Sequence, residues 1–113
     1  MAIEKKALWV VFKLKEGQTK EEMRKEHLKV YDMFLNMPGL FSKLFWFNQD
    51  KDEWGSLYVF NSEKDLQNYI TSDLWLHQIP ATFGKPEMTI VEPGPILYKS
   101  AVTKGENSWL EEI

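Results

Sequence analysis

The sequence contains no cysteine, and this absence excludes several kinds of site at once. Without thiols the chain can form no disulfide, no thiolate metal site and no cysteine nucleophile. It also lacks an apolar run near the roughly 20 residues that cross a bilayer, and residues 1–6 lack the apolar core of a signal peptide. We therefore expect a soluble, cytoplasmic protein that does not bind a membrane.

Basic residues are few and scattered: 14 Lys and Arg stand against 17 Asp and Glu, and the net charge is −3. No basic run is longer than Lys5-Lys6, so binding to nucleic acid through its phosphates is not expected. The chain has two histidines, and it lacks a His-x-x-x-His pair, a Gly-rich phosphate loop and a nucleophile elbow. The sequence therefore predicts no bound metal and no other cofactor, and it offers no hydrolase motif.

The 113 residues are 43% hydrophobic, which is enough for one compact core. Runs rich in β-branched and aromatic residues predict strands over 6–14, 40–48, 53–61 and 87–92, the last resuming at 96–99. Capping boxes predict helices over about 19–37 and 62–70, and Ser72 restarts a turn or two that end before Pro80. We expect one domain over residues 1–100 and a C-terminal tail over 101–113, either mobile or docked on a partner subunit.

The element order β-α-β-β-α-β predicts an α+β, ferredoxin-like fold, in which two helices cover one face of a four-stranded antiparallel sheet. Alternation along the second strand gives two sets of side chains, and both sets are apolar. One set is Leu40, Leu44 and Trp46, and the other is Phe41, Phe45 and Phe47. Because the helices cover only one face, the sequence predicts a homodimer that pairs through the bare sheet faces.

A resemblance supports this reading. The corner 37–41, MPGLF, resembles the dimeric α+β barrel superfamily, which includes the antibiotic-biosynthesis monooxygenases. The longer stretch 38–69 is similar to the YdhR-like monooxygenases, which share a Pro-Gly corner, a Lys in the second strand, a Gly before a Tyr-x-Phe third strand and an acidic-Lys helix start. The resemblance implies a dimeric barrel and, for many members, cofactor-independent oxidation of electron-rich aromatic substrates.

Other members of the superfamily degrade haem, cyclise polyketides, isomerise lactones or bind ligands without catalysis. The haem-degrading members carry an Asn in the first strand, and residues 7–14 of this chain contain none. The histidines of the plant cyclases fall at Ser72 and Trp75 here. Haem degradation and the plant cyclase chemistry are therefore disfavoured, and the fold by itself does not decide the function.

His27 is the first candidate catalytic residue, because it stands within the apolar stripe of the first helix and points toward the space between helix and sheet. A neutral imidazole there could act as a general base on a phenol or an enol. Tyr58 and Tyr69 are the candidate hydroxyls that hold a developing oxyanion. The alternative is a core histidine whose nitrogens are satisfied by the protein itself.

Further aromatic residues are candidates for stacking on a flat ligand, since rings with a polar edge both pack and orient it. The candidate substrate-binding residues are Trp9, Phe34, Trp46, Trp75 and His77. For each aromatic residue the alternative is packing in the core or the dimer interface, and for His77 it is a solvent-facing position.

Three functional hypotheses remain open at this point. The first is a cofactor-independent monooxygenase that acts on a small aromatic or quinone-like substrate in a pocket between sheet and helices. The second is a non-catalytic dimer, stress-related or binding a small apolar ligand. The third is a cyclase or isomerase that uses the same histidine without oxygen.

Overall fold

The computed structural model describes residues 4–97. The tail predicted over 101–113 and the end of the strand predicted over 96–99 lie outside the described residues, and residues 92–97 form no strand. The elements in chain order are β1 (Lys6–Lys13), α1 (Lys20–Leu35), β2 (Leu40–Asn48), the 3₁₀ turn η1 (Gln49–Lys51), β3 (Glu53–Phe60), α2 (Glu63–Ile70), η2 (Leu74–Gln78), α3 (Ile79–Phe83) and β4 (Glu87–Val91).

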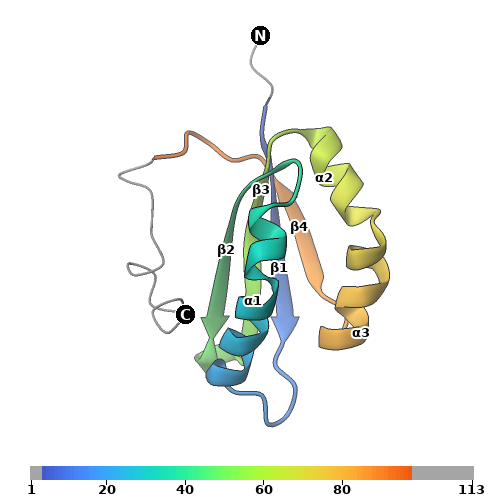
Figure 1. Ribbon diagram of the computed structural model, residues 1–113. Helices are drawn as coiled ribbons and strands as arrows, with labels where there is room; N and C mark the ends of the chain where they lie inside the picture. The colour runs from blue at the N-terminus through green and yellow to red at the C-terminus, as the bar shows by residue number, and fades with distance from the viewer. Residues whose placement is uncertain (1–3, 98–113) are drawn as a thin grey trace.

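The four strands form one antiparallel sheet in the order β2-β3-β1-β4, and the helices cover one of its faces (Figure 1). Side chains of β1 and β3 meet those of α1 and α2 to form the core. Its fully buried members are Leu8, Val10, Met23, Phe60 and Leu66. The predicted α+β, ferredoxin-like fold is confirmed. None of the helices within residues 4–97 is long and apolar enough to cross a membrane.

Side-chain caps set the starts of the two main helices as predicted. The Thr19 hydroxyl accepts a hydrogen bond from the Glu22 N–H at 3.2 Å, and the Ser62 hydroxyl accepts one from the Asp65 N–H at 3.2 Å. Each bond satisfies one of the backbone donors that a helix leaves free in its first turn. At the end of α1, Gly39 takes a left-handed φ of +83° and turns the chain into β2.

The segment after α2 differs from the sequence prediction. Helix does not end before Pro80 but continues through a π-helical turn, η2, into α3 as far as Phe83. Pro80 directly follows Ile79, whose N–H bonds to the Leu74 carbonyl five residues back, so the N–H that Pro80 lacks falls where π-helical pairing gives way to α-helix. This longer helical segment lies across from α1 on the same face of the sheet (Figure 1).

A β-bulge near Phe41 changes which side chains of β2 share a face. Leu40 pairs with Phe60, whereas Ser42 pairs with Val59, so the pairing shifts by one residue at this point. Leu40 therefore packs against the helix-covered core, and the predicted grouping of Leu40 with Leu44 and Trp46 is wrong. Strict alternation fails here because a bulge adds one residue to one strand only.

Within residues 4–97, no helix covers the other face of the sheet, and much of this face is apolar. Trp9 and Trp46 stack on it with ring centroids 5.1 Å apart, and Leu44 is 60% exposed. Pairing across the strands puts Leu57 and Val59 on the same face. Apolar side chains of β2 therefore lie on both faces, as predicted, whereas β4 adds Glu87 and Thr89 to this one. We call the face without helices the open sheet face.

Candidate functional site

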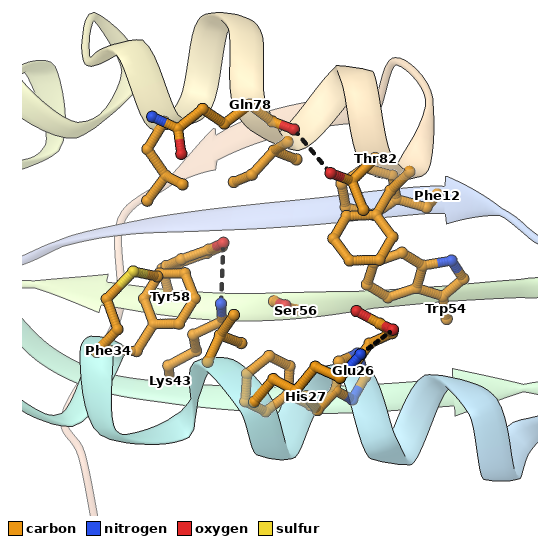
Figure 2. A pocket seen from close by; sticks show the side chains of 17 residues that line it. Phe12, Glu26, His27, Phe34, Lys43, Trp54, Ser56, Tyr58, Gln78 and Thr82 are labelled. Atoms are coloured by element: carbon orange, nitrogen blue, oxygen red, sulfur yellow. Dashed lines mark hydrogen bonds and ion pairs between the residues drawn. The ribbon is translucent and has the colours of Figure 1, made fainter.

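A pocket of about 280 Å³ lies between α1, the sheet, and the η2–α3 segment (Figure 2). Most of its lining is aromatic or aliphatic. The principal lining residues are Phe12, His27, Val30, Phe34, Lys43, Phe45, Trp54, Tyr58, Leu74, Ile79 and Phe83. Concave, mainly apolar sites with few polar groups are typical of small-molecule binding sites, and this volume suits a molecule of one or two rings.

Lys43 is the most unusual group in this pocket. Its amine donates a hydrogen bond to the Tyr58 hydroxyl at 3.1 Å, and Figure 2 shows the two groups directed at each other. The same Nζ lies 3.1 Å from the centre of the Phe34 ring and 4.3 Å from that of Phe45. Burial lowers the pKa of Lys43 well below its usual range, because the charged form loses its hydration. The ring faces offset part of that loss, since a cation is attracted to them.

Two tyrosine hydroxyls extend the polar chain from Lys43 into the core. Tyr58 and Tyr69 are both buried, and their hydroxyl oxygens lie 2.8 Å apart in a hydrogen bond in which either can donate. Burial raises the pKa of both phenols, so both stay protonated at neutral pH. The chain Tyr69–Tyr58–Lys43 is therefore a continuous path of hydrogen bonds that ends at the pocket.

His27 lies on the α1 side of the pocket and is 4% exposed. Its ring stacks on Phe45 with centroids 4.1 Å apart and lies 5.3 Å from Trp54. Burial, with a smaller contribution from the charge of Lys43, lowers the pKa of His27 to about 3. The imidazole is therefore neutral at physiological pH and holds a proton weakly.

The structure brings some of the candidate residues together. His27, Tyr58 and Phe34 line the pocket, and Tyr69 lies behind Tyr58. Trp75 packs on Tyr69, with centroids 5.5 Å apart, and is not among the residues that line the pocket.

The remaining candidates lie elsewhere. Trp9 and Trp46 stand on the open sheet face, so the expectation that they bind substrate in this pocket does not agree with their position. Alternation along each strand sends them to the face opposite Trp54 and Tyr58. His77 is exposed, and its Nδ1 lies 3.0 Å from an Asp73 carboxylate oxygen, which agrees with the solvent-facing alternative.

Sequence reasoning noted Lys43 only as part of a family resemblance and did not name it as a site residue. A usable signal was present, because Lys43 is the one charged residue in β2 and lies two residues before Phe45 on the inner face. Within residues 4–97, no group of three or more His, Asp or Glu side chains is placed to hold a metal ion.

Comparison with known proteins agrees with this fold. Residues 8–92 match the family described as "Putative mono-oxygenase ydhR", and the chain belongs to that family. This membership places the chain among monooxygenase-like proteins. No curated protein matches the chain in sequence.

Solved structures of the same fold show how far this architecture extends. A protein of unknown function from Nitrosomonas europaea superposes with a TM-score of 0.69 at 17% identity, covering 89% of this chain and 100% of that one. SnoaB, a cofactor-independent oxygenase from Streptomyces nogalater, has a TM-score of 0.62 at 12% identity, with coverage of 83% and 97%. A "putative antibiotic biosynthesis monooxygenase" from Caulobacter crescentus CB15 has a TM-score of 0.63 at 15% identity, with coverage of 82% and 92%. At these identities the likeness establishes the fold alone.

Proposed function

We propose that this chain is a cofactor-independent monooxygenase that oxidises a small aromatic, phenol-like or quinone-like substrate in the pocket. Family membership supports the general reaction class. The observation that carries the proposal is the Lys43 amine, hydrogen-bonded to Tyr58 at 3.1 Å within a largely aromatic pocket. A flat ligand packs well against such rings, and one acidic group on it can meet the amine.

The reaction begins with loss of a proton from the substrate. The resulting anion transfers an electron to O₂, the two radicals combine at carbon, and the peroxide formed loses water. One oxygen atom of O₂ ends as a carbonyl oxygen on the substrate and the other as water, so a CH₂ group becomes C=O. The protein contributes a dry site and hydrogen-bond donors directed at the developing oxyanion.

The base in this reaction is better assigned to Lys43 than to His27. A base with a pKa of about 3 that faces a phenol of pKa near 10 meets an unfavourable gap of about 10 kcal/mol. The Lys43 amine, whose pKa burial lowers from its usual range, can accept the substrate proton, and the ammonium that it becomes stabilises the substrate anion. In this assignment the Tyr58 hydroxyl holds the oxyanion, Tyr69 orients that hydroxyl through their hydrogen bond, and neutral His27 orients the substrate ring.

Oxygen uptake tests the proposal. The purified protein is supplied with a panel of one-ring and two-ring hydroquinones, and ¹⁸O₂ is used to follow the label into the product. We expect one labelled oxygen atom per product, and we expect Lys43→Met to lower the rate at least about a hundredfold. Lys51→Met, an exposed lysine on η1, is the matched control and should keep the wild-type rate.

One result would contradict the role of Lys43, and two others would contradict the oxygenase itself. A rate in Lys43→Met equal to that of the wild type would mean that Lys43 is not the base. Turnover that persists without oxygen would favour the isomerase or cyclase. Tight binding of aromatic ligands without turnover of any of them would favour a binding protein.

We also propose that two copies of the chain pair through the open sheet face. This face carries exposed apolar side chains such as Leu44, and a stacked Trp9–Trp46 pair lies on it. A patch of this kind on a small domain is typical of an interface, since exposed apolar surface associates readily in water. The occupant that fits is a second copy, because the same flat face is complementary to itself under two-fold symmetry.

Light scattering of wild-type and variant chains tests the pairing. Leu44→Glu places a charge on the open sheet face, and we expect it to give monomers at concentrations where the wild type is a dimer. Leu35→Glu is the matched control, because Leu35 is equally apolar and 67% exposed but lies on α1. A wild-type monomer at micromolar concentration would refute the pairing.

A further inference from the structure

The environment of Lys43 differs from that of the lysines that form ion pairs. Lys6, Lys13 and Lys29 each contact a carboxylate, at 2.6, 2.9 and 3.0 Å respectively. Among the ion pairs within residues 4–97, none includes Lys43. Its amine instead contacts the Tyr58 hydroxyl and the faces of aromatic rings.

None of the ionisable groups that line the pocket forms an ion pair with the Lys43 amine. From α1 come neutral His27 and Glu26, whose carboxylate lies 3.0 Å from the Lys29 amine. From β3 comes the protonated phenol of Tyr58. The lining supplied by η2 and α3 contains no acid or base, and its polar members are Gln78 and Thr82.

An amine in this setting has the two properties that a nucleophilic lysine needs. Burial without a carboxylate favours the neutral form, and the nitrogen lies in a pocket that a small molecule can fill. Exposed lysines remain protonated at neutral pH, so their nitrogen lone pairs are seldom available.

We propose that Lys43 is a carbonyl-reactive amine that forms a Schiff base with small aromatic aldehydes bound in the pocket. The Nζ attacks the carbonyl carbon to give a carbinolamine. A C=N bond then replaces the C=O bond, and the carbonyl oxygen leaves as water with the two protons of the amine. No oxidant or reductant takes part.

The Tyr58 hydroxyl at 3.1 Å from the Nζ assists this condensation. It donates a proton to the departing oxygen and takes one back from the nitrogen, while its 2.8 Å hydrogen bond to Tyr69 holds the hydroxyl in position. The surrounding rings of Phe34 and Phe45 favour an aromatic aldehyde over an aliphatic one of similar size. This activity uses the same pocket as the proposed oxygenase but does not depend on the reaction with oxygen.

Reductive trapping tests the proposal. The full chain is incubated with benzaldehyde and sodium cyanoborohydride at pH 7.5, and benzylated lysines are located by peptide mass spectrometry. We expect Lys43 to be labelled at least tenfold faster than Lys29, which lines the same pocket and appears in the same digest. We also expect labelling of Lys43 to fall less steeply between pH 8.5 and pH 7 than labelling of exposed lysines, which falls about tenfold per pH unit.

Variants test whether the fast labelling needs the primary amine of Lys43 and the Tyr58 hydroxyl. Lys43→Arg keeps a cation without a primary amine and should lose the fast labelling, Lys51→Met should keep it, and Tyr58→Phe should slow it severalfold. If the Lys43 variant does not fold, the comparison of Lys43 with Lys29 in the wild-type digest still decides.

Slow labelling of Lys43, no faster than that of Lys29, would overturn the proposal. So would a rate at Lys43 that falls tenfold per pH unit, because that would show a protonated amine. Failure of the oxygenase assay alone would leave fast labelling unaffected, so the two proposals can fail separately.

Discussion

Burial of His27 predicts a specific dependence of stability on pH. The pKa of this ring is lowered to about 3 in the folded chain, against 6.5 for a solvated histidine. Between these two values the unfolded chain binds a proton that the folded chain does not bind. The free energy of unfolding therefore falls as the pH is lowered through this range, and the contribution of His27 is fully present only above pH 6.5.

The size of the effect follows from the same two values. From pH 6.5 to pH 4.5 the loss is two pH units at 1.36 kcal/mol each, or about 2.7 kcal/mol. The ring is 4% exposed, so solvent screens this contribution little. A loss of this size is a large fraction of the stability of a domain this small.

Urea unfolding of the wild type and of His27→Gln, from pH 7.5 to pH 4.5 at one protein concentration, measures this contribution. Carboxylates titrate in both proteins and cancel in the difference, so the wild type should lose about 2.7 kcal/mol more than the variant. His77→Gln is the matched control, because that ring is exposed, and it should follow the wild type. Parallel curves for the wild type and His27→Gln would refute the reasoning and would mean that the folded chain admits a proton at His27.

Three further predictions concern the same fold and pocket. The lowered pKa of Lys43 means that the unfolded chain binds an extra proton below about pH 10.5, so the stability of the wild type should rise relative to Lys43→Met between pH 7 and pH 10; parallel urea curves would contradict this. Gly55→Ala would drive a Cβ into the Val10 carbonyl oxygen and should cost at least about 3 kcal/mol by chemical denaturation. Gly17→Ala, in open space at φ +82°, should cost only about 1–2 kcal/mol by the same measurement, and equal losses would exclude the steric explanation. Tyr69→Phe should lower the free energy of unfolding by about 1 kcal/mol, and no change would mean that its hydroxyl is no better bonded in the folded chain than in water.

The parts of the fold that were predicted correctly depend mostly on short sequence motifs. The capping boxes at Thr19 and Ser62 and the Pro-Gly corner before β2 act within a few residues, and the structure agrees with them. The errors arose where tertiary packing decides. The extension of helix past Pro80 depends on a π-helical turn that no local pattern indicated.

The site was predictable only in part. The spacing of the α1 stripe correctly placed His27 and Phe34 on the inner side of the helix. Which face of the sheet the helices cover could not be read from strands that are apolar on both faces, so Trp9 and Trp46 were expected at the pocket. The role of Lys43 was missed because its environment is made by residues from three different elements, which only folding brings together.

The bulge at Phe41 has a consequence for comparing relatives of this chain. It allows Leu40 and Lys43, an odd number of residues apart, to face the same way. A relative that lacks one residue at this point would keep Lys43 in the pocket, and a one-residue gap there is neutral for the site. A one-residue insertion or deletion between Lys43 and Asn48 would instead exchange the amine with Leu44 and so move it onto the open sheet face. Alignments of this strand are therefore best judged by whether a length change after Lys43 is odd or even. An even change keeps each side chain on its face, and an odd change exchanges the pocket lining with the open sheet face.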